Sequence, residues 1–455
     1  PSTPPNADDK TAVAALKKLG AQSEQDGQGN VIGLTLSSTK ITDAGLVHLK
    51  GLTNLQKLNL GFDPLTGVFS RITDAGLVHL KGLTNLTNLN LYRTKITDAG
   101  LMQLKGLTKL EALNLYGTQV TDAGLVHLKG LTKLQELYLP REKIGDSGLE
   151  HLTGLTNLQT LSIDPGGQKS NISDAGLVHL KGLTNLQDLG LNFTKITDDG
   201  LAHLKELTRL QELILADTPV TDAGLDHLKG LTNLQTLRLD GTQVTGAGLV
   251  NLKGLTKLQK LTLYLTQVTD AGLVHLKGLT ELRALHLSGR KVTDAGLINL
   301  KGLIKLQKLN LYDIKLTNAG LAHLKGLTKL QVLDLIRAKI TDEGLVHLNG
   351  LTGLQTLKFR DIKLTDAGLV HLKGLTNLQE LDLYKTQVTD EGLVHFKGLA
   401  KLQKLRLVNT QVTDAGLVHL KGLTNLRLVD LSFTQVSDAG IAELRKALPD
   451  CKIIK

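Results

Sequence analysis

Leucines return along this chain in a pattern that repeats every 24 residues. In the stretch Ile41 to Leu60, ITDAGLVHLKGLTNLQKLNL, Leu46 and Leu49 lie three residues apart, which places both on one side of a helix. Leu58 and Leu60 alternate with polar residues, and this alternation predicts a strand with one buried face. Strand, short helix and strand in this order predict parallel strands joined by right-handed crossovers.

The helical part of the repeat carries its own start and stop signals. Thr42 is placed to cap the helix, and Asp43 puts a negative charge in the first turn, where it complements the helix dipole. Gly51 stands where we expect the helix to end in the left-handed conformation. The helix spans only about two turns, and a helix this short is stable only when it packs against other elements.

The repeat is written into the chain about seventeen times. A period of this kind predicts a solenoid, in which each repeat buries its apolar face against its neighbours. An ordinary chain of 455 residues would suggest about three domains, but the unbroken repeat predicts one elongated domain. The string GLVHLKGL begins unchanged at Gly45, Gly76, Gly124, Gly176, Gly272, Gly368 and Gly416.

The pattern LxxLxLxxT followed by ITDAGLxxL resembles the leucine-rich repeat, with threonine in place of the usual asparagine or cysteine. The helical part is similar to repeats of bacterial, notably planctomycete, proteins. The resemblance covers residues 31–455. It implies an α/β leucine-rich-repeat solenoid, a horseshoe of about 17 repeats of 24 residues. In such a solenoid a parallel β-sheet forms the concave face and short helices form the convex face. The resemblance implies little about the ligand, because this fold hosts many unrelated partners.

The two ends of the chain depart from the repeat, as the exposed ends of a solenoid require. The first residues are rich in proline, and the last ones predict a helix followed by a short strand. The predicted organisation is a disordered linker at 1–7, an N-terminal cap of helix plus hairpin at 8–36, leucine-rich repeats at 37–441 and a C-terminal cap at 442–455.

Composition narrows the function classes. The net charge is +10, but much of it comes from one lysine repeated in the last helical turn, where it complements the dipole. Nucleic-acid binding is not expected, because no basic cluster is interleaved with aromatic residues. The single cysteine excludes an internal disulfide, and no apolar run approaches the ~20 residues of a membrane span. Because the chain starts at Pro1 rather than Met, we favour an exported or cell-envelope location over the cytoplasm, and we expect a monomer.

Histidines and aspartates each recur at one position of the repeat, and we call these two series the histidine ladder and the aspartate ladder. Either series could suggest a metal site, but we predict none. Thirteen of the 14 histidines hold one repeat position between two core leucines, so we expect them to point to solvent on the convex face. Rings of successive repeats would be too far apart to share one zinc ion at ~2.0–2.1 Å. The aspartates fit the first helical turn without calcium, and Gly246 and Asn318 replace them in two repeats. Nothing resembles a nucleophile elbow or a phosphate loop, so we predict no catalytic residue, cofactor or metal.

The outward positions of the strands vary from repeat to repeat, and there we expect the function. Aromatic residues make up only 3% of the chain, yet most of them follow or lie on strands. Exposed tyrosines provide rigid contact area with a polar end and are enriched at interfaces, although tyrosine also simply suits a strand. The predicted partner-binding residues are Tyr92, Tyr116, Tyr138, Phe62, Phe193, Arg238, Tyr264, His286, Tyr312, Arg360, Tyr384 and Arg406.

Charge and length also vary at these positions. The middle strands have an acidic bias and the later strands are more basic, although aspartates are interspersed. Two insertions, Gly61–Arg71 and Asp164–Asn171, follow strands and leave the same edge of the sheet. We hypothesise that they form a lip over the strands that carry Tyr92, Tyr116 and Tyr138. The alternative is tolerated length variation in surface loops.

The function that these features favour is that of a non-catalytic scaffold recognising a protein or peptide partner on its concave face. A carbohydrate or cell-surface ligand receptor is the first alternative, because pairs such as Asn90 with Tyr92 and Asn114 with Tyr116 offer hydrogen bonds beside an aromatic ring. A passive structural or spacer role is the second, because near-identical repeats would be sufficient for it.

Overall fold

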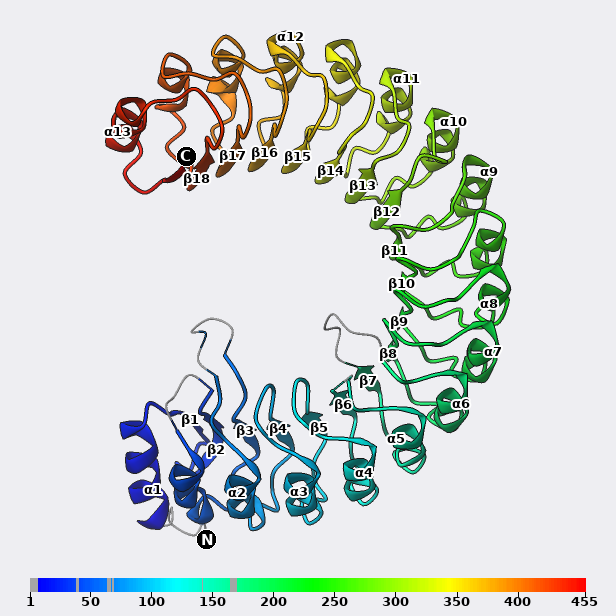
Figure 1. Cartoon of the computed structure of the whole chain (residues 1–455), viewed down its shortest axis with the longest axis vertical. Coiled ribbons are helices and arrows are strands. Elements are labelled where there is room, and N and C mark those ends of the chain that lie inside the picture. The colour runs from blue at the N-terminus through cyan, green and yellow to red at the C-terminus, as the bar shows by residue number, and fades with distance from the viewer. Residues whose placement is uncertain (1–6, 38–40, 64–66, 68, 141, 164–169) are drawn as a thin grey trace. The chain divides into compact units, whose positions relative to one another are not determined.

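The computed structural model describes residues 7–37, 41–63, 67, 69–140, 142–163 and 170–455. These form two compact units, which we call unit 1 (residues 1–220) and unit 2 (residues 221–455). Within each unit the strands line one face and the short helices line the other (Figure 1). The predicted α/β leucine-rich-repeat solenoid is confirmed in each unit, whereas the boundaries given to the linker, the caps and the repeats stay predictions.

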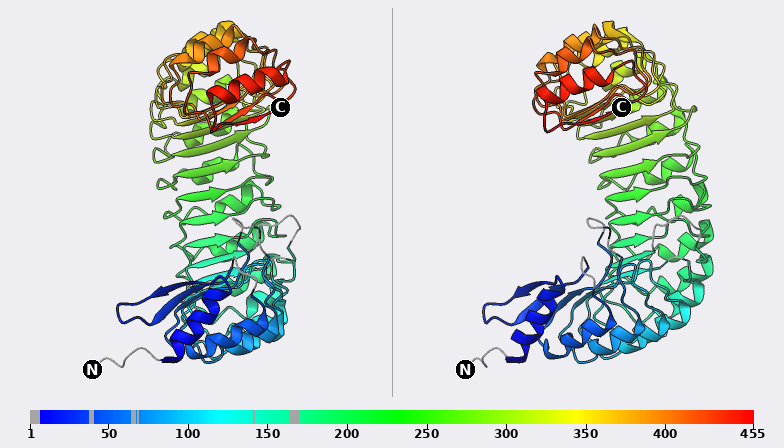
Figure 2. Two further views of the ribbon diagram at one scale, coloured as in Figure 1. Left: turned by 90° about the vertical axis from the view of Figure 1, so that its left-hand side faces the viewer. Right: turned by 60° about the vertical axis from the view of Figure 1, so that its left-hand side comes forward.

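Unit 1 begins with a helix and a hairpin. Helix α1 (Ala7–Lys18) packs against the 3₁₀ helix η1 (Asp43–Gly51) of the first repeat. Strands β1 (Gln22–Gln25) and β2 (Val31–Thr35) pair antiparallel (Figure 2). The turn between them is held by Asp26, whose Oδ1 accepts the backbone N–H groups of Gln28 and Asn30 at 2.9 Å each.

The remaining strands of unit 1 pair parallel and in register, one from each repeat. They are β3 (Lys57–Asn59), β4 (Asn88–Asn90), β5 (Ala112–Asn114), β6 (Glu136–Leu139), β7 (Thr160–Ile163), β8 (Asp188–Gly190) and β9 (Glu212–Ile214). The helices between them are α2 (Asp74–Leu77), α3 (Asp98–Leu101), α4 (Asp122–Leu125), α5 (Asp146–Glu150), α6 (Asp174–Leu177) and α7 (Asp198–Leu201). Most of these α-helical turns continue as a 3₁₀ turn, such as η3 (Met102–Leu104) after α3.

Unit 2 repeats the same arrangement with parallel strands. Its strands are β10 (Thr236–Arg238), β11 (Lys260–Leu263), β12 (Ala284–Ser288), β13 (Lys308–Tyr312), β14 (Val332–Asp334), β15 (Thr356–Lys358), β16 (Glu380–Asp382), β17 (Lys404–Arg406), β18 (Leu428–Asp430) and β19 (Lys452–Ile454). Its α-helices are α8 (Asp222–Asp226), α9 (Asp270–Leu273), α10 (Asp294–Leu297), α11 (Asn318–Leu321), α12 (Asp366–Leu369) and α13 (Asp438–Ala447).

The core is a stack of leucines, with a buried threonine in eight of the repeats. Leu91, Leu101 and Leu104 are fully buried, and each such side chain contributes roughly 1.5–3 kcal/mol. Thr94 is buried as well, and its hydroxyl donates to the carbonyl oxygen of Leu91 at 2.7 Å. This bond explains why threonine replaces the usual asparagine: its short side chain satisfies a backbone carbonyl at the turn that follows the strand.

The aspartate ladder joins most repeats to the next one. Oδ1 of Asp98 accepts the backbone N–H of Thr121 at 2.7 Å, and Oδ2 accepts the Thr121 hydroxyl at 2.6 Å. The glycine of the same later repeat leaves room for this carboxylate, because a Cβ at Gly124 would lie 2.2 Å from Oδ1 of Asp98. The prediction assigned the aspartates to the dipole of their own helix. It therefore missed their main contact, which is with the threonine of the next repeat.

The helix ends differ from the prediction. Thr42 makes no side-chain capping bond, whereas the hydroxyl of Thr73 in the next repeat accepts the N–H of Ala75 at 3.3 Å. The prediction of a left-handed Gly51 is wrong, because Gly51 lies inside η1 and its φ is not positive. The chain leaves η1 through Leu52, whose N–H donates to the carbonyl of Leu49.

Left-handed residues occur instead at one position after the strand. Arg93 (φ 53°), Gly117 (φ 66°) and Phe193 (φ 59°) occupy this position in their repeats. At Arg93 and Phe193 the backbone N–H donates to a carbonyl of the following repeat at 2.8 Å. That bond holds residues other than glycine in a conformation that costs them roughly 1–2 kcal/mol.

The histidine ladder also lies differently from the prediction. His79 is half-buried, and the side chain that faces solvent is Val78, which is 43% exposed. Nδ1 of His79 and of five further ladder histidines is buried without a hydrogen-bond partner among the described residues. The spacing between two core leucines therefore predicted the wrong exposure, because one edge of these rings is buried.

Candidate ligand-binding surfaces

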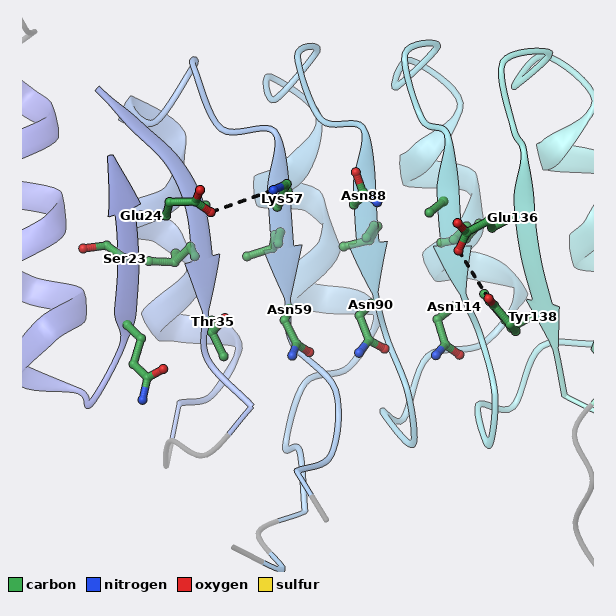
Figure 3. Close-up of a pocket in the computed structure, with 17 residues that line it drawn as sticks. Ser23, Glu24, Thr35, Lys57, Asn59, Asn88, Asn90, Asn114, Glu136 and Tyr138 are labelled. Atoms are coloured by element: carbon green, nitrogen blue, oxygen red, sulfur yellow. Dashed lines mark hydrogen bonds and ion pairs between the residues drawn. The ribbon is translucent and has the colours of Figure 1, made fainter. Parts of the chain in front are cut away.

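Parallel pairing in register arranges the outward side chains of unit 1 in rows across the strands. The row that crosses the ends of the strands consists of Thr35, Asn59, Asn90, Asn114 and Tyr138. Neighbouring members of such a row stand about 4.8 Å apart, which is the distance between strands. The hairpin at one end and Tyr138 at the other bound a groove with a volume of about 480 Å³ (Figure 3).

Three asparagines form the centre of that row (Figure 3). Each side-chain oxygen accepts a backbone N–H two residues further on: Gly61 at 3.1 Å, and Tyr92 and Tyr116 at 2.9 Å. These bonds fix the amide orientation, because the oxygen and not the nitrogen must face the backbone N–H. The Nδ2 groups of Asn59, Asn90 and Asn114 therefore face the groove, and they have no partner among the described residues.

Tyr138, one of the predicted residues, lines the far end of the groove, and Tyr116, another predicted residue, contacts its ring. The rings of Tyr116 and Tyr138 meet edge to face with centroids 5.4 Å apart. The hydroxyl of Tyr138 donates to Glu136 at 3.2 Å, and the hydroxyl of Tyr116 bonds to Ser162. Burial and then the charge of Glu136 raise the pKa of Tyr138, so this hydroxyl stays protonated at neutral pH.

Phe62 and Tyr92 form a second aromatic cluster beside the first insertion. Their rings are 6.0 Å apart, and Phe69 stacks on Phe62 at 4.9 Å. The guanidinium of Arg93 lies 5.2 Å from the ring centre of both Phe62 and Tyr92, a cation–π geometry. Residues 164–169 of the second insertion lie outside the described residues, so the predicted lip stays a hypothesis.

The strand face of unit 2 is organised around a fully buried carboxylate. Asp382 is 0% exposed, and its Oδ2 accepts Nε of Arg360 at 2.7 Å and Nη1 of Arg406 at 3.4 Å. Its Oδ1 accepts the backbone N–H of Tyr384 at 3.1 Å. The basic bias predicted for the later strands is thus offset locally, because the two arginines share one buried aspartate.

Further charges extend this surface along the strands. Arg337 and Lys385 flank Asp361 at 3.5 Å and 3.0 Å. Burial raises the pKa of Asp334, whose Oδ1 is buried without a hydrogen-bond partner among the described residues. The lining residues Tyr312, Arg337, Arg360, Tyr384 and Arg406 enclose about 470 Å³.

Three other predicted residues of unit 2 lie on the earlier strands. The rings of Tyr264 and Tyr312 meet at 5.3 Å. Arg238 forms an ion pair with Asp240 at 3.4 Å, so its charge is partly neutralised within the chain. His286 stands on β12, and burial lowers its pKa and favours the neutral ring.

Phe193 differs from the tyrosines with which it was grouped. It occupies the left-handed position, one residue beyond the position of Tyr92 in its own repeat. Its backbone N–H donates to Ala216 and its carbonyl accepts from Ser170 at 2.8 Å each. The structure therefore places Phe193 in the turn after the strand, whereas Tyr138 is part of a strand.

The residues that the prediction missed are mostly polar. Asp382, Arg93 and Phe69 contact predicted residues, and Asn59 lines the groove together with Tyr138, but none of the four was predicted. Asn59 was detectable, because it holds the same repeat position as Asn90 and Asn114. The central position of Asp382 was not detectable, since interspersed aspartates on neighbouring strands look alike in the sequence.

No metal or membrane feature adds to these surfaces. Across the residues that the structure describes, no three His, Cys, Asp or Glu side chains are grouped so that they could hold a metal ion. None of the helices in the described part of the chain has the length and apolar character needed to cross a membrane.

Comparison with known protein families decides the family. A leucine-rich repeat region model matches residues 64–318, which is more than half of the chain. The chain belongs to the leucine-rich repeat family. A second leucine-rich repeat model matches residues 326–348, 374–396 and 422–444. No curated protein is significantly similar to the chain in sequence.

Solved structures that match the chain include proteins from bacteria and a plant. A leucine-rich repeat protein of Leptospira interrogans is 21% identical, with a TM-score of 0.55, and the match covers 90% of this chain and 92% of that one. An internalin of Listeria monocytogenes is 25% identical, with a TM-score of 0.49 and coverage of 88% and 94%. A plant peptide hormone receptor in complex with RGF2 is 14% identical, with a TM-score of 0.44 and coverage of 90% and 71%.

Proposed function

We propose that this leucine-rich repeat protein is a non-catalytic scaffold and that the strand face of unit 2 recognises a protein or peptide partner. The observation that carries the proposal is the fixed arrangement of arginine and tyrosine side chains around Asp382. A carboxylate buried on an outward strand position is costly unless it is fully paired, and here both oxygens are paired. The result is a pair of arginines and Tyr384 held in place before any partner arrives.

Tyrosine and arginine are the residues that most often dominate binding energy at protein interfaces. Tyr312, Arg337 and Tyr384 line one hollow of this face, and the guanidinium of Arg337 lies 5.9 Å from the ring centre of Tyr312. Because the side chains are already ordered, little conformational entropy is lost when a partner binds. Mixed charges across the hollow favour a partner with both acidic and basic groups over a uniform polyanion.

The test uses the full chain and a displayed library of random peptides. Peptides enriched on the wild-type protein are synthesised, and their dissociation constants are measured. Arg337→Ala and Tyr384→Ala are each expected to weaken binding about tenfold or more, as truncation of an interface anchor does. Lys373→Ala is the matched control on the helix side, where the lysine is exposed, and it should leave affinity unchanged.

Two results would count against the proposal. One is the absence of any enriched peptide. The other is a peptide whose affinity is the same for the wild-type protein, Arg337→Ala and Tyr384→Ala, with unfolding curves showing that the variants are folded.

A further inference from the structure

The groove of unit 1 contains a row of three amide donors that have no partner among the described residues and that the proposed function does not use. The Nδ2 groups of Asn59, Asn90 and Asn114 belong to three adjacent strands and stand in register. Their oxygens are committed to backbone N–H groups at 2.9–3.1 Å, so rotation of an amide would break a bond. The groove thus offers three fixed donors at the spacing between strands, about 4.8 Å.

This spacing discriminates between linear ligands that lie across the strands. An extended peptide presents carbonyls on one side only every second residue, about 6.6–6.8 Å, and it falls out of step with the amides within three positions. A β-1,4-linked chain of pyranose rings has a repeat close to the distance between strands. Every ring of such a chain brings hydroxyl and ring oxygens that accept hydrogen bonds, so each amide meets one sugar.

The walls and the charge of the groove fit the same ligand. Tyr138 closes one end, and its ring is held by Tyr116 and by the bond to Glu136, which leaves an aromatic surface for the C–H face of a sugar. Ala112 leaves the floor open between Asn88 and Glu136 in the second row.

The charged residues of the lining disfavour an anionic chain. They are Glu24, Lys57 and Glu136, which together give one net negative charge. Lys57 lies 3.9 Å from Glu24, so its charge is partly neutralised within the groove. A polysulfate or polyphosphate would meet uncompensated carboxylate at Glu136.

We propose that the groove of unit 1 binds a neutral β-1,4-linked oligosaccharide, one sugar to each asparagine amide, with a ring stacked on Tyr138. This site and the surface of unit 2 that the proposed function uses consist of different residues, so each proposal is tested by its own variants. A groove volume of about 480 Å³ lies within the ~300–1,000 Å³ of ligand sites and accommodates a short oligosaccharide.

The experiment titrates the full chain with cellohexaose and with chitohexaose in a calorimeter. We expect saturable binding of at least one of the two, with shorter oligosaccharides binding more weakly as amide contacts are lost. Asn90→Asp is the diagnostic variant. Its carboxylate still accepts the N–H of Tyr92 but no longer donates into the groove, so affinity should fall about tenfold or more.

Matched variants separate recognition from folding. Asn310→Asp changes the same repeat position on β13 in unit 2 and should leave sugar affinity unchanged. Tyr138→Ala should abolish most binding, whereas Tyr138→Phe keeps the ring and should bind within about twofold of the wild type, because it loses only a hydroxyl directed at Glu136. Thermal unfolding curves of all variants show that they are folded.

Three outcomes would overturn the proposal. The first is no detectable binding of either oligosaccharide. The second is sugar binding that Asn90→Asp and Tyr138→Ala leave intact, because the ligand would then lie elsewhere. The third is a peptide from the displayed library whose binding depends on Asn90 while no oligosaccharide binds, which would assign the groove to a peptide.

Discussion

Asp98 and Thr121 belong to successive repeats, and the Asp98 carboxylate accepts both the backbone N–H and the hydroxyl of Thr121, at 2.7 Å and 2.6 Å. The same pair of bonds recurs through both units, for example from Asp174 to Thr197 and from Asp366 to Thr389. This contact ties the start of each helix to the previous repeat, so the helices are positioned by their neighbours as much as by their own turns.

Removal of one such carboxylate should weaken the stack. Asp98→Ala leaves the N–H and hydroxyl of Thr121 without their acceptor, and we expect the free energy of unfolding to fall by about 1–3 kcal/mol. Asp98→Asn should cost less than half as much, because Asn318 already shows an amide in this role. Its oxygen accepts the N–H of Thr341 at 2.9 Å and its nitrogen donates to the Thr341 hydroxyl at 2.8 Å. Urea unfolding of the two variants measures the difference, and equal destabilisation would contradict this interpretation.

Two glycines of one repeat should respond in opposite ways to the same substitution. In Gly124→Ala the new Cβ would lie 2.2 Å from Oδ1 and 3.1 Å from Cα of Asp98, so the carboxylate must move and its bonds weaken. We expect a loss of about 1–3 kcal/mol. Gly130→Ala meets no atom within 4 Å and has no positive φ, so it should be neutral or stabilise by about 0.4–1 kcal/mol. Thermal unfolding compares them, and a destabilising Gly130→Ala would show that the available space does not decide the effect.

The C-terminal repeats should lose stability in acid. The hydroxyl and backbone N–H of Ser437 lower the pKa of Asp414, so the folded protein holds this carboxyl ionised to lower pH than the unfolded chain does. The stabilisation is therefore complete above the unfolded pKa of about 3.9 and disappears as the pH falls through the lower folded value. Asp414→Asn should unfold more easily than the wild type at pH 7, and the difference should vanish in strong acid.

Asp450→Asn provides the control for this titration, because Asp450 is exposed and no side-chain hydrogen bond of it is among the described contacts. Its difference from the wild type should be small at pH 7. A difference for Asp414→Asn that does not change with pH would mean that Ser437 does not shift the titration of Asp414.

Replacing an arginine beside the buried carboxylate of Asp382 should destabilise unit 2. Arg360→Met removes the 2.7 Å bond to Asp382 and leaves the longer contact with Arg406 at 3.4 Å as its ion pair, so part of a buried charge loses its partner. We expect a loss of about 2–4 kcal/mol in the free energy of unfolding. The double variant Arg360→Met with Asp382→Leu should recover much of that loss, since no buried charge remains. Failure of the double variant to recover stability would indicate that the packing of Arg360, and not the ion pair, matters.

The sequence predicted most of the fold because the repeat fixes the periodicity. Leu58 and Leu60 marked a strand with one buried face, and Leu46 and Leu49 marked a helix, and the structure confirms both elements. Gly51 was misjudged because a glycine after a helix is usually a left-handed cap, whereas here Gly51 is the last residue of the 3₁₀ helix η1 and Leu52 follows as its cap. The histidines were misjudged because their position between two core leucines does not show that one edge of the ring is buried.

The candidate sites were only partly visible in the sequence. The pairs Asn90 with Tyr92 and Asn114 with Tyr116 stood out because they recur at one repeat position. The structure changes their interpretation. Each asparagine oxygen accepts the backbone N–H of the tyrosine, and only the amide nitrogen faces the groove. Asp382 looked like one of several aspartates until its burial between Arg360 and Arg406 set it apart.

The sequence by itself determined the repeat, the alternation of inward and outward side chains and the aliphatic core, because these depend on contacts within one repeat and its copy. Only the tertiary structure decided which polar groups remain free. The register between repeats sets which groups meet, such as Asp98 with Thr121 and Arg360 with Asp382. Among the described residues this leaves three amide nitrogens of unit 1 without a partner, and it holds the tyrosines and arginines of unit 2 in an ordered face.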